Sequence, residues 1–274
     1  MPELPEIETI KRTLEPKLIG QRILSLDVRR PDVLKHPGPS EFIQAVTGQQ
    51  VECLSRRGKY LRIHMHSDSL LVVHLRMTGR LICLAPSVEE NVHTHVIFHL
   101  DSGDELRFSD VRRFGGLWFL QPGELDTYTG MSKLGPEPFG EEFSSEYLLA
   151  AIHRRRCSIK QILLDQTVVA GLGNIYCDEV LFSAGIRPDR SEHTLTLEEC
   201  STLVESVRQV LTEAIQHRGT TFSDFLDGNG QAGENYPFLL AYQHGGHPCP
   251  RCGTIMEKVR IGGRSTCFCP ACQR

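Results

Sequence analysis

The segment Cys249-Pro250-Arg251-Cys252 is followed, after sixteen further residues, by Cys269-Pro270-Ala271-Cys272. Each C-x2-C pair can direct two thiolates from one tight turn, and a short hairpin can bring the two pairs together. Four thiolates that leave no coordination position open are typical of a structural zinc site. We therefore expect one structural zinc ion in a C-terminal ribbon, because so short a segment cannot bury a core of its own and needs the metal to fold. The alternative is four buried cysteines without a metal.

The other cysteines do not extend this pattern. Cys267 lies two residues before Cys269 and outside the two pairs, and His244 and His247 are weaker candidates as ligands. The remaining thiols are scattered along the chain, which suits reduced cysteines in the cytosol better than a disulfide framework. They are Cys53, Cys83, Cys157, Cys177 and Cys200.

Charge and hydropathy narrow the class of protein. The 274 residues carry a formal net charge of −4, a length that suffices for two or three domains. There is no apolar run long enough for a transmembrane helix, and the acidic, proline-rich N-terminus does not resemble a signal peptide. Negative net charge argues weakly against a nucleic-acid partner, but clustering matters more than the total. The basic clusters are Arg29-Arg30, Arg56-Arg57 with Lys59, Arg112-Arg113, and Arg154-Arg155-Arg156 with Lys160.

The first half of the chain has a β pattern after one helix. Residues 5–15 predict a short helix with Ile7, Ile10 and Leu14 on one face, and Pro16 and Gly20 bracket its end. From about residue 22 to residue 120, apolar and polar residues alternate in short runs, of which Leu24, Leu26 and Val28 form the first. Residues 96–108 predict a hairpin with its turn at 101–104. Several short strands with turn signals favour an antiparallel sandwich.

The second half has a helical period. Residues 121–140 are rich in glycine and proline and predict a linker. The clearest helix is 197–217, preceded by Thr196 and Glu199 at the spacing of a capping box and stopped by Gly219. Residues 227–236 hold three glycines without periodicity, and we predict a mobile loop there.

Six signatures in this order resemble the formamidopyrimidine-DNA glycosylase family, bacterial base-excision enzymes for oxidised purines. Each signature alone is weak, whereas their joint order and spacing are specific and span nearly the whole chain. They are Met1-Pro2-Glu3-Leu4-Pro5-Glu6, Arg56-Arg57-Gly58-Lys59-Tyr60, His74-Leu75-Arg76-Met77, Val111-Arg112-Arg113-Phe114-Gly115, Gly171-Leu172-Gly173-Asn174-Ile175-Tyr176, and the ribbon with Arg264.

The resemblance implies an α+β fold in three domains. Residues 1–134 would form an N-terminal antiparallel β-sandwich with a leading helix, the catalytic domain. Residues 135–244 would form a helix-two-turn-helix DNA-binding domain with a lesion-capping loop, and residues 245–274 the zinc ribbon. We expect DNA to run through a basic cleft between the two halves of the chain.

Pro2 is the candidate nucleophile. After removal of Met1, its secondary α-amine would titrate near ~8, so an appreciable fraction would be neutral at pH 7. Such an amine can attack an aldehyde-like carbon and give an iminium ion. Taken alone, Pro2 reads as an ordinary N-terminal proline. The resemblance implies instead that it attacks C1′ of the damaged nucleoside and forms a Schiff base.

Three further residues receive catalytic roles from the resemblance. Glu3 would protonate the deoxyribose ring oxygen; otherwise it is a carboxylate that stabilises a helix start. Lys59 would contact phosphate at the lesion and assist β-elimination; otherwise it lies at a solvated strand end. Arg264 would hold the other flanking phosphate and assist δ-elimination.

Other residues would contact DNA. Asn174 follows two glycines at a predicted helix start, which suits either a phosphate site or an ordinary Asn N-cap; the resemblance favours phosphate. A glycosylase flips its target nucleotide and must fill the hole, and Met77 and Phe114 suit that wedge role while Arg112 suits the widowed cytosine. The alternative places Met77 and Phe114 in the core. By resemblance, His93, Arg112 and Arg155 also contact DNA.

The function that we expect is a bifunctional DNA glycosylase and AP lyase that excises 8-oxoguanine and formamidopyrimidines and cleaves by β,δ-elimination. Its partner would be double-stranded DNA containing oxidised bases or abasic sites, bound by a monomer in the bacterial cytoplasm, without a membrane. Ser223 departs from the Arg or Lys that the family often carries in the capping loop, which puts the lesion preference in doubt. The alternatives are an endonuclease-VIII-like enzyme for oxidised pyrimidines and a non-catalytic zinc-ribbon DNA-binding protein.

Overall fold

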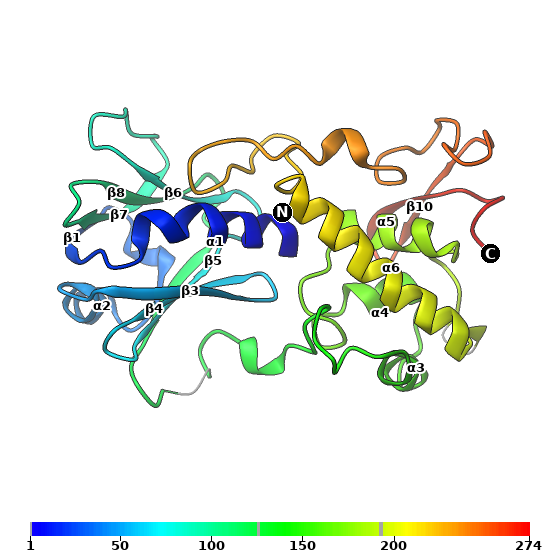
Figure 1. Ribbon diagram of the computed structural model, residues 1–274, viewed down its shortest axis with the longest axis horizontal. Helices are drawn as coiled ribbons and strands as arrows, with labels where there is room; N and C mark the ends of the chain where they lie inside the picture. Colours follow the sequence, from blue (N-terminus) through cyan, green and yellow to red (C-terminus); the bar gives the residue numbers. More distant parts are fainter. Residues whose placement is uncertain (1, 125–126, 192–193) are drawn as a thin grey trace. The chain divides into compact units, whose positions relative to one another are not determined.

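The computed structural model describes residues 2–124, 127–191 and 194–274 (Figure 1). The chain forms two compact units. The first comprises Met1–Ser132 together with His217–Tyr236, and the second comprises Lys133–Gln216 together with Pro237–Arg274. The predicted removal of Met1 concerns a residue outside the described part of the chain. The domain boundaries 1–134, 135–244 and 245–274 stay predictions.

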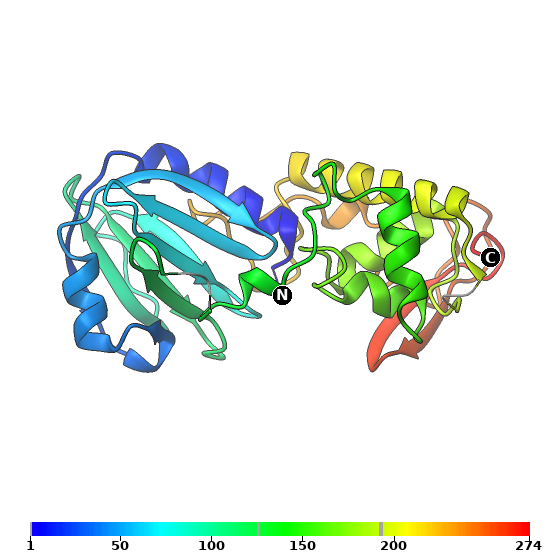
Figure 2. The ribbon, with the colours of Figure 1, turned by 90° about the horizontal axis from the view of Figure 1, so that it is seen from below.

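Two sheets form the sandwich of the first unit, and Figure 2 shows them stacked as layers. One sheet has the order β1 (Ile23–Val28), β7 (Thr94–Leu100), β8 (Glu105–Asp110) and β6 (Gly79–Leu84). The other has the order β2 (Leu34–His36), β9 (Gly116–Leu120), β5 (Leu70–His74), β4 (Tyr60–Met65) and β3 (Val51–Arg57). The predicted antiparallel sandwich is confirmed, with one exception, since β2 pairs with β9 in parallel.

The leading helix is α1 (Leu4–Leu18), and it packs against β3, β4 and β6, strands from both sheets. The predicted apolar stripe of Ile7, Ile10 and Leu14 is buried. The prediction that Pro16 and Gly20 bracket the end of this helix is confirmed, since the helix ends at Leu18, although it passes the predicted limit of residue 15. Proline removes only one N–H from the helix ladder, and the fully buried Leu18 anchors the last turn in the core.

The first strand shows a second departure from the sequence pattern. The pairing of β1 with β7 shifts register between Ile23 and Ser25. Such a bulge turns one residue out of the alternation. Ile23 is therefore buried, whereas Leu24, which the alternation placed with Leu26, is 53% exposed. The short α2 (Pro39–Val46) and the 3-10 turn η1 (Pro31–Val33) complete the described elements on this side of the linker.

The second unit is helical and carries the ribbon. Its helices are α3 (Ser145–His153), α4 (Ile159–Leu164), α5 (Asn174–Ala184) and α6 (Leu197–Gln216), and α6 packs against α3 and α5. The capping box of α6 is confirmed, since Thr196 N–H donates to Glu199 Oε2 at 2.9 Å and Glu199 N–H donates to Thr196 Oγ1 at 3.2 Å. Two 3-10 turns, η2 (Met131–Lys133) and η4 (Tyr236–Phe238), lie in the connections.

The C-terminal ribbon is a hairpin of β10 (Glu257–Ile261) and β11 (Arg264–Phe268). Gly262 and Gly263 form its two-residue turn, and both have positive φ, 55° and 77°, as hairpin turns of this length require. β11 packs against α5 (Figure 1). Among the described residues, none of the helices combines the length and the hydrophobicity that a bilayer-spanning helix needs.

Candidate functional site

The N-terminal end of α1 is buried and tightly hydrogen-bonded. Pro2 is buried and Glu3, the N-cap of the helix, is 2% exposed. The Glu6 carboxylate accepts the Glu3 N–H at 2.7 Å through one oxygen and the Thr220 N–H at 2.8 Å through the other. A carboxylate at a helix N-terminus is stabilised by the helix dipole. Glu6 therefore fixes both Glu3, the neighbour of the candidate nucleophile, and Thr220, which lies in the segment after α6.

Lys59 lies in the turn that joins β3 to β4. The turn begins at Gly58, whose φ of 54° is left-handed, and Lys59 is 6% exposed. Both strands pack against α1, and Arg56 Nε donates to Glu8 Oε2 at 3.3 Å. The hairpin end that carries Lys59 is thereby tied to the helix that begins with Glu3. The alternative of a solvated strand end does not fit this burial.

His74 lies beside Lys59; in the sequence it belongs to one of the six signatures, but no role was predicted for it. It is opposite Tyr60 in the β4–β5 pairing, and it is 5% exposed. Burial first, and then the positive charges of Arg76 and Lys59, lower the pKa of His74 to about 3. The imidazole is therefore neutral at ordinary pH. Its Nδ1 accepts the Arg76 N–H at 3.0 Å, so the ring proton is on Nε2.

Met77, Arg112 and Phe114 form one exposed group. Met77 is 40% exposed and Phe114 is 54% exposed. The Arg112 guanidinium lies 4.6 Å from the centroid of the Phe114 ring, and its Nη1 lies 3.0 Å from Met77 Sδ. Apolar side chains in the core of this unit are almost fully buried, so the alternative that Met77 and Phe114 are core residues is wrong. The structure brings the three residues together, as their predicted joint role requires.

Asp110 organises the two loops that carry this group, and no sequence pattern pointed to it. Its carboxylate is 1% exposed. One oxygen accepts from Thr78 Oγ1 at 2.5 Å and from the Arg112 N–H at 3.2 Å, and the other accepts from the Gly115 N–H at 2.8 Å. Thr78 follows Met77 directly, so a single buried carboxylate positions both sides of the group.

His93 lines a cavity of about 400 Å³ with several basic side chains. Arg29 and Arg30 belong to the same wall, and each is paired with an acidic residue, Glu90 and Asp32 respectively. The remaining lining residues are Val92, Thr94, His95, Val111 and Arg113. Two of the basic clusters seen in the sequence thus meet at one cavity in the first unit.

In the second unit, Asn174 and Arg264 are brought together. Gly173 is the N-cap of α5 and Asn174 is its first helical residue, so the reading of Asn174 as an N-cap is wrong. Asn174 Nδ2 donates to the carbonyl of Ser265 at 3.0 Å. Ser265 follows Arg264, which is exposed at the start of β11. The N-terminus of α5, with its positive dipole end, and the Arg264 guanidinium could together bind one anion.

Arg155 is placed differently from the other predicted DNA contacts. Its Nε and Nη2 both donate to Asp165 Oδ2 at 3.1 Å, and Nη1 donates to the carbonyl of Ala151 at 2.9 Å. The guanidinium therefore joins the end of α3 to the residue that caps α4. Its side chain is 26% exposed, so one edge still reaches solvent.

A buried ion pair holds the ribbon against the helices. Lys160 Nζ lies 2.6 Å from Asp178 Oδ1, and both side chains are buried. Lys160 also donates to the carbonyl of Ser265 and to Thr266 Oγ1, while Asp178 Oδ2 accepts the Cys267 N–H at 3.1 Å. Lys160, from the basic cluster of residues 154–160, thus has a structural role. Cys267 contributes to the same contact through its backbone N–H, which Asp178 accepts.

The four cysteines of the two C-x2-C pairs converge at one point. The Sγ atoms of Cys249, Cys252, Cys269 and Cys272 all lie within 4.8 Å of one another. Cys249 Sγ is 3.9 Å from Cys272 Sγ, and Cys252 Sγ is 3.5 Å from Cys269 Sγ. A tetrahedral zinc site with Zn–S bonds of ~2.3 Å has sulfurs about 3.8 Å apart. The donor set therefore fits one structural zinc ion, and His244, His247 and Cys267 are not part of it.

Comparison with known proteins agrees with this geometry. Three family models match in order: the N-terminal domain of formamidopyrimidine-DNA glycosylase over residues 1–117, its H2TH domain over 134–225, and a zinc finger found in FPG and IleRS over 246–274. The formamidopyrimidine-DNA glycosylase of Pelotomaculum thermopropionicum is 47% identical over 274 residues, which cover 100% of this chain and 99% of that protein.

Solved structures extend the comparison. A variant of the Lactococcus lactis enzyme in complex with Fapy-dG-containing DNA superposes with a TM-score of 0.93 at 34% identity, over 100% of both chains. The wild-type Lactococcus lactis enzyme in complex with DNA that contains an oxidised pyrimidine has a TM-score of 0.91, again at 34% identity and over 100% of both chains. With two domain models of this family over residues 1–117 and 134–225 and relatives that match from end to end, the chain belongs to the formamidopyrimidine-DNA glycosylase family and is a DNA glycosylase.

Proposed function

We propose that the protein excises oxidised purines, 8-oxoguanine and formamidopyrimidines, from duplex DNA and then cleaves the strand at the resulting abasic site. The observation that carries this proposal is the buried start of α1, where Glu6 holds the Glu3 N–H beside Pro2. Removal of Met1 would leave the secondary amine of Pro2 at this point, next to a carboxyl group. Nucleophile and acid would then be adjacent in a site that excludes water.

The reaction would run through an iminium ion. The Pro2 nitrogen attacks C1′, the bond from C1′ to the base breaks, and the base leaves with a proton. Glu3 protonates the ring oxygen, the sugar opens, and the proline nitrogen loses its proton to give the Schiff base. Loss of a C2′ proton then expels the 3′ phosphate, a second elimination expels the 5′ phosphate, and water releases the sugar fragment from Pro2.

The remaining site residues would hold the DNA. Lys59 would contact the phosphate at the lesion and assist the first elimination, and Arg264 with Asn174 would hold a flanking phosphate. Met77 and Phe114 would fill the gap left by the flipped nucleotide. Arg112 would pair with the orphaned cytosine, and His93 and Arg155 would add backbone contacts. We propose that a monomer does this work in the bacterial cytoplasm.

Borohydride trapping on an abasic-site duplex tests the proposal. The parent protein should form a covalent adduct that maps to Pro2, and a protein that retains Met1 should form none, because its terminal amine is then displaced from the site. Glu3→Gln should lose most base release from intact lesions while it still cleaves preformed abasic sites. A protein that keeps Met1 and works at full rate would contradict the proline mechanism, and no adduct with any duplex would favour a non-catalytic DNA-binding protein.

A preference for oxidised pyrimidines is the second candidate. It draws support from the Lactococcus lactis relative, which was captured with an oxidised-pyrimidine DNA. Ser223 in the segment after α6 leaves that preference open, since the family often carries a long basic residue there. Single-turnover excision of 8-oxoguanine beside an oxidised pyrimidine, in otherwise identical duplexes, separates the two.

A further inference from the structure

The segment Thr220–Asn235 lies between α6, which ends at Gln216, and η4, and only part of its length is exposed. Phe222 is 39% exposed and Ser223 is also exposed, whereas Phe225 and Asp227 are buried in the first unit. We call Phe222–Asp224 the tip of the segment. The segment has no regular secondary structure, as predicted for 227–236, but its buried part makes a dense set of hydrogen bonds.

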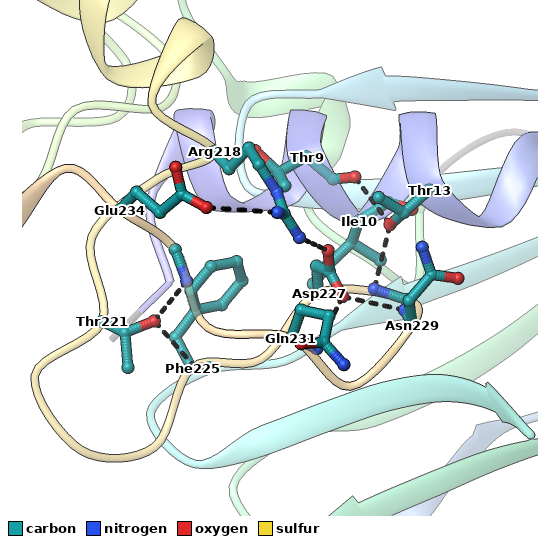
Figure 3. A network of polar contacts seen from close by, with 12 residues as sticks. Thr9, Ile10, Thr13, Arg218, Thr221, Phe225, Asp227, Asn229, Gln231 and Glu234 are labelled. Atoms are coloured by element: carbon teal, nitrogen blue, oxygen red, sulfur yellow. Dashed lines mark hydrogen bonds and ion pairs between the residues drawn. The ribbon is translucent and has the colours of Figure 1, made fainter.

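Asp227 is the centre of these bonds (Figure 3). It is 1% exposed. Its Oδ1 accepts the N–H groups of Asn229 and Gln231, both at 2.9 Å, and its Oδ2 accepts from Arg218 Nη2 at 2.6 Å. The carboxylate thus closes the turn 227–231 and attaches it to the residue just beyond α6. Hydrogen bonds to an ionised acceptor are stronger than neutral ones.

Arg218 occupies a backbone conformation that favours glycine. Its φ is 59°, in the left-handed region that other residues rarely adopt. Its guanidinium reaches Asp227 with one nitrogen and Glu234 Oε1, at 3.3 Å, with another. Backbone strain persists where surrounding contacts impose it, and such residues concentrate at functional sites. An arginine at a position that favours glycine therefore indicates that the two ion pairs of its side chain matter here.

The turn is held on its other side by the sandwich. The Gly228 N–H donates to Thr13 Oγ1 of α1 at 2.9 Å, and the Gly228 carbonyl accepts the Cys83 N–H of β6 at 3.0 Å. A Cβ at position 228 would lie 2.5 Å from Leu14 Cγ. Asp227 therefore connects Arg218 to a turn held between α1 and β6.

The ends of the tip are fixed by the same segment and by β6. Thr221 Oγ1 donates to the Phe225 carbonyl and accepts the Gly233 N–H, each at 2.9 Å (Figure 3). Arg80 Nε donates to the Asp224 carbonyl at 2.6 Å. The N–H of Thr220 donates to Glu6, whose other oxygen holds Glu3. The tip is thus a short exposed loop, and Thr220, two residues before it, contacts the candidate catalytic end of α1.

We propose that Arg218 and Asp227 are positioning residues for base recognition, whose ion pair fixes the turn 227–231 and through it the tip that faces the everted base. This inference rests on the proposed function. An intact lesion presents a base that the tip must hold beside Glu3 while the bond to C1′ breaks. A preformed abasic site presents none, so the ion pair governs base release and leaves strand cleavage at an abasic site unaffected.

The test compares Arg218→Gln and Asp227→Asn with the parent, all full-length and zinc-loaded. Single-turnover rates with excess enzyme are measured on an 8-oxoguanine duplex and on an abasic-site duplex. We expect both variants to release the base about tenfold more slowly, while abasic-site cleavage changes by less than about twofold. Amide exchange at Asn229 and Gln231 should become faster, since both N–H groups are bonded to Asp227.

Two matched variants sharpen the result. Glu234→Gln changes the other partner of Arg218, a side chain that is 67% exposed, and should keep the parent rates. Arg218→Lys keeps the positive charge without the planar fork and should recover part of the base-release rate lost in Arg218→Gln.

Three outcomes would overturn the inference. Base release at the parent rate despite faster exchange at Asn229 and Gln231 would show that the tip needs no such support. An equal fall in both reactions would assign the ion pair to the stability of the unit alone. A parent that neither releases a base nor cleaves an abasic site would overturn the proposed function and the inference with it, and this outcome is visible before any variant is made.

Discussion

At the scale of single residues, solvent exposure decides whether Met77 and Phe114 are core residues or surface residues that could contact DNA. Methionine and phenylalanine are core residues in most positions, and sequence alone could not separate that reading from a wedge role. Met77 at 40% and Phe114 at 54% exposure are joined by Arg112 on the surface, and a buried Asp110 holds the loops beneath them. Exposed apolar side chains supported by a buried polar anchor indicate a contact surface.

Truncation of the wedge residues should affect catalysis more than stability. A buried Phe or Met replaced by Ala costs ~2–5 kcal/mol, whereas half-exposed side chains lose much less. We therefore expect Met77→Ala and Phe114→Ala to melt within a few degrees of the parent. Excision of 8-oxoguanine should slow by about tenfold for each ~1.4 kcal/mol of lost support for the flipped state. Melting curves beside single-turnover rates check this, with Phe108→Ala, fully buried in the same unit, as the control that should melt early.

His74 should make the protein sensitive to acid. In the unfolded chain its pKa has the ordinary value of 6.5, whereas in the folded protein it is about 3. Between these values the unfolded state binds a proton that the folded state does not, so stability falls as the pH falls from 6.5 toward 3. The loss amounts to roughly 3 kcal/mol at pH 4. His74→Asn retains an acceptor for the Arg76 N–H, and its unfolding free energy should change less between pH 7 and pH 4; an identical pH dependence would contradict the assignment.

Residue-level prediction from the sequence was strongest where chemistry restricts spacing. The four zinc ligands follow from two short motifs, because thiolates in a C-x2-C turn converge through local geometry alone. Asp110, His74 and Asp227 could not be found in this way. Asp110 and Asp227 act through partners that folding brings near, Thr78 and Arg218, and the burial that lowers the pKa of His74 also arises only in the folded chain.

At the scale of elements, the periodicity of apolar residues predicted which helices and strands exist better than it predicted where they begin and end. The stripe of α1 and the capping box of α6 are local patterns, and both were confirmed. The last turn of α1, beyond residue 15, and the β1 bulge were missed because tertiary burial outweighs local preference there. Leu18 and Ile23 reach the core, and the backbone adapts to place them.

The zinc ribbon is the element whose stability depends most on a cofactor. Its small core includes Cys249, Met256 and Cys269 packed against Phe182 of α5, so removal of the metal should unfold the ribbon and leave the sandwich intact. We expect Cys249→Ser or Cys272→Ser to weaken DNA binding, and elemental analysis of the parent to find about one zinc per chain. Arg264→Ala should weaken binding while zinc content stays unchanged. A metal-free protein with normal DNA affinity would contradict this role.

At the scale of the whole molecule, the chain order and the compact units do not coincide. His217–Tyr236 follows the helices in sequence and packs with the first unit. Phe225 from this segment belongs to the hydrophobic core of the sandwich. Linker composition at 121–140 indicated where the chain leaves the sandwich, but no composition change marks where it returns. A short segment that fills a place in an existing core has the same local pattern as any loop.

A fragment of residues 1–134 should therefore be much less stable than the same residues in the full chain. It would lack Phe225, and burial of a Phe contributes ~3–5 kcal/mol. It would also lose the Gly228 carbonyl that accepts the Cys83 N–H and the Thr220 N–H that satisfies the buried Glu6. At ~3–5 °C per kcal/mol for a domain of this size, we expect the melting temperature to fall by about 10 °C or more. Phe225→Ala in the full chain should reproduce part of the loss in the unfolding of the sandwich. A 1–134 fragment that melts with the intact protein would show that the sandwich folds without its returning segment, and that residue 134 is a true domain boundary.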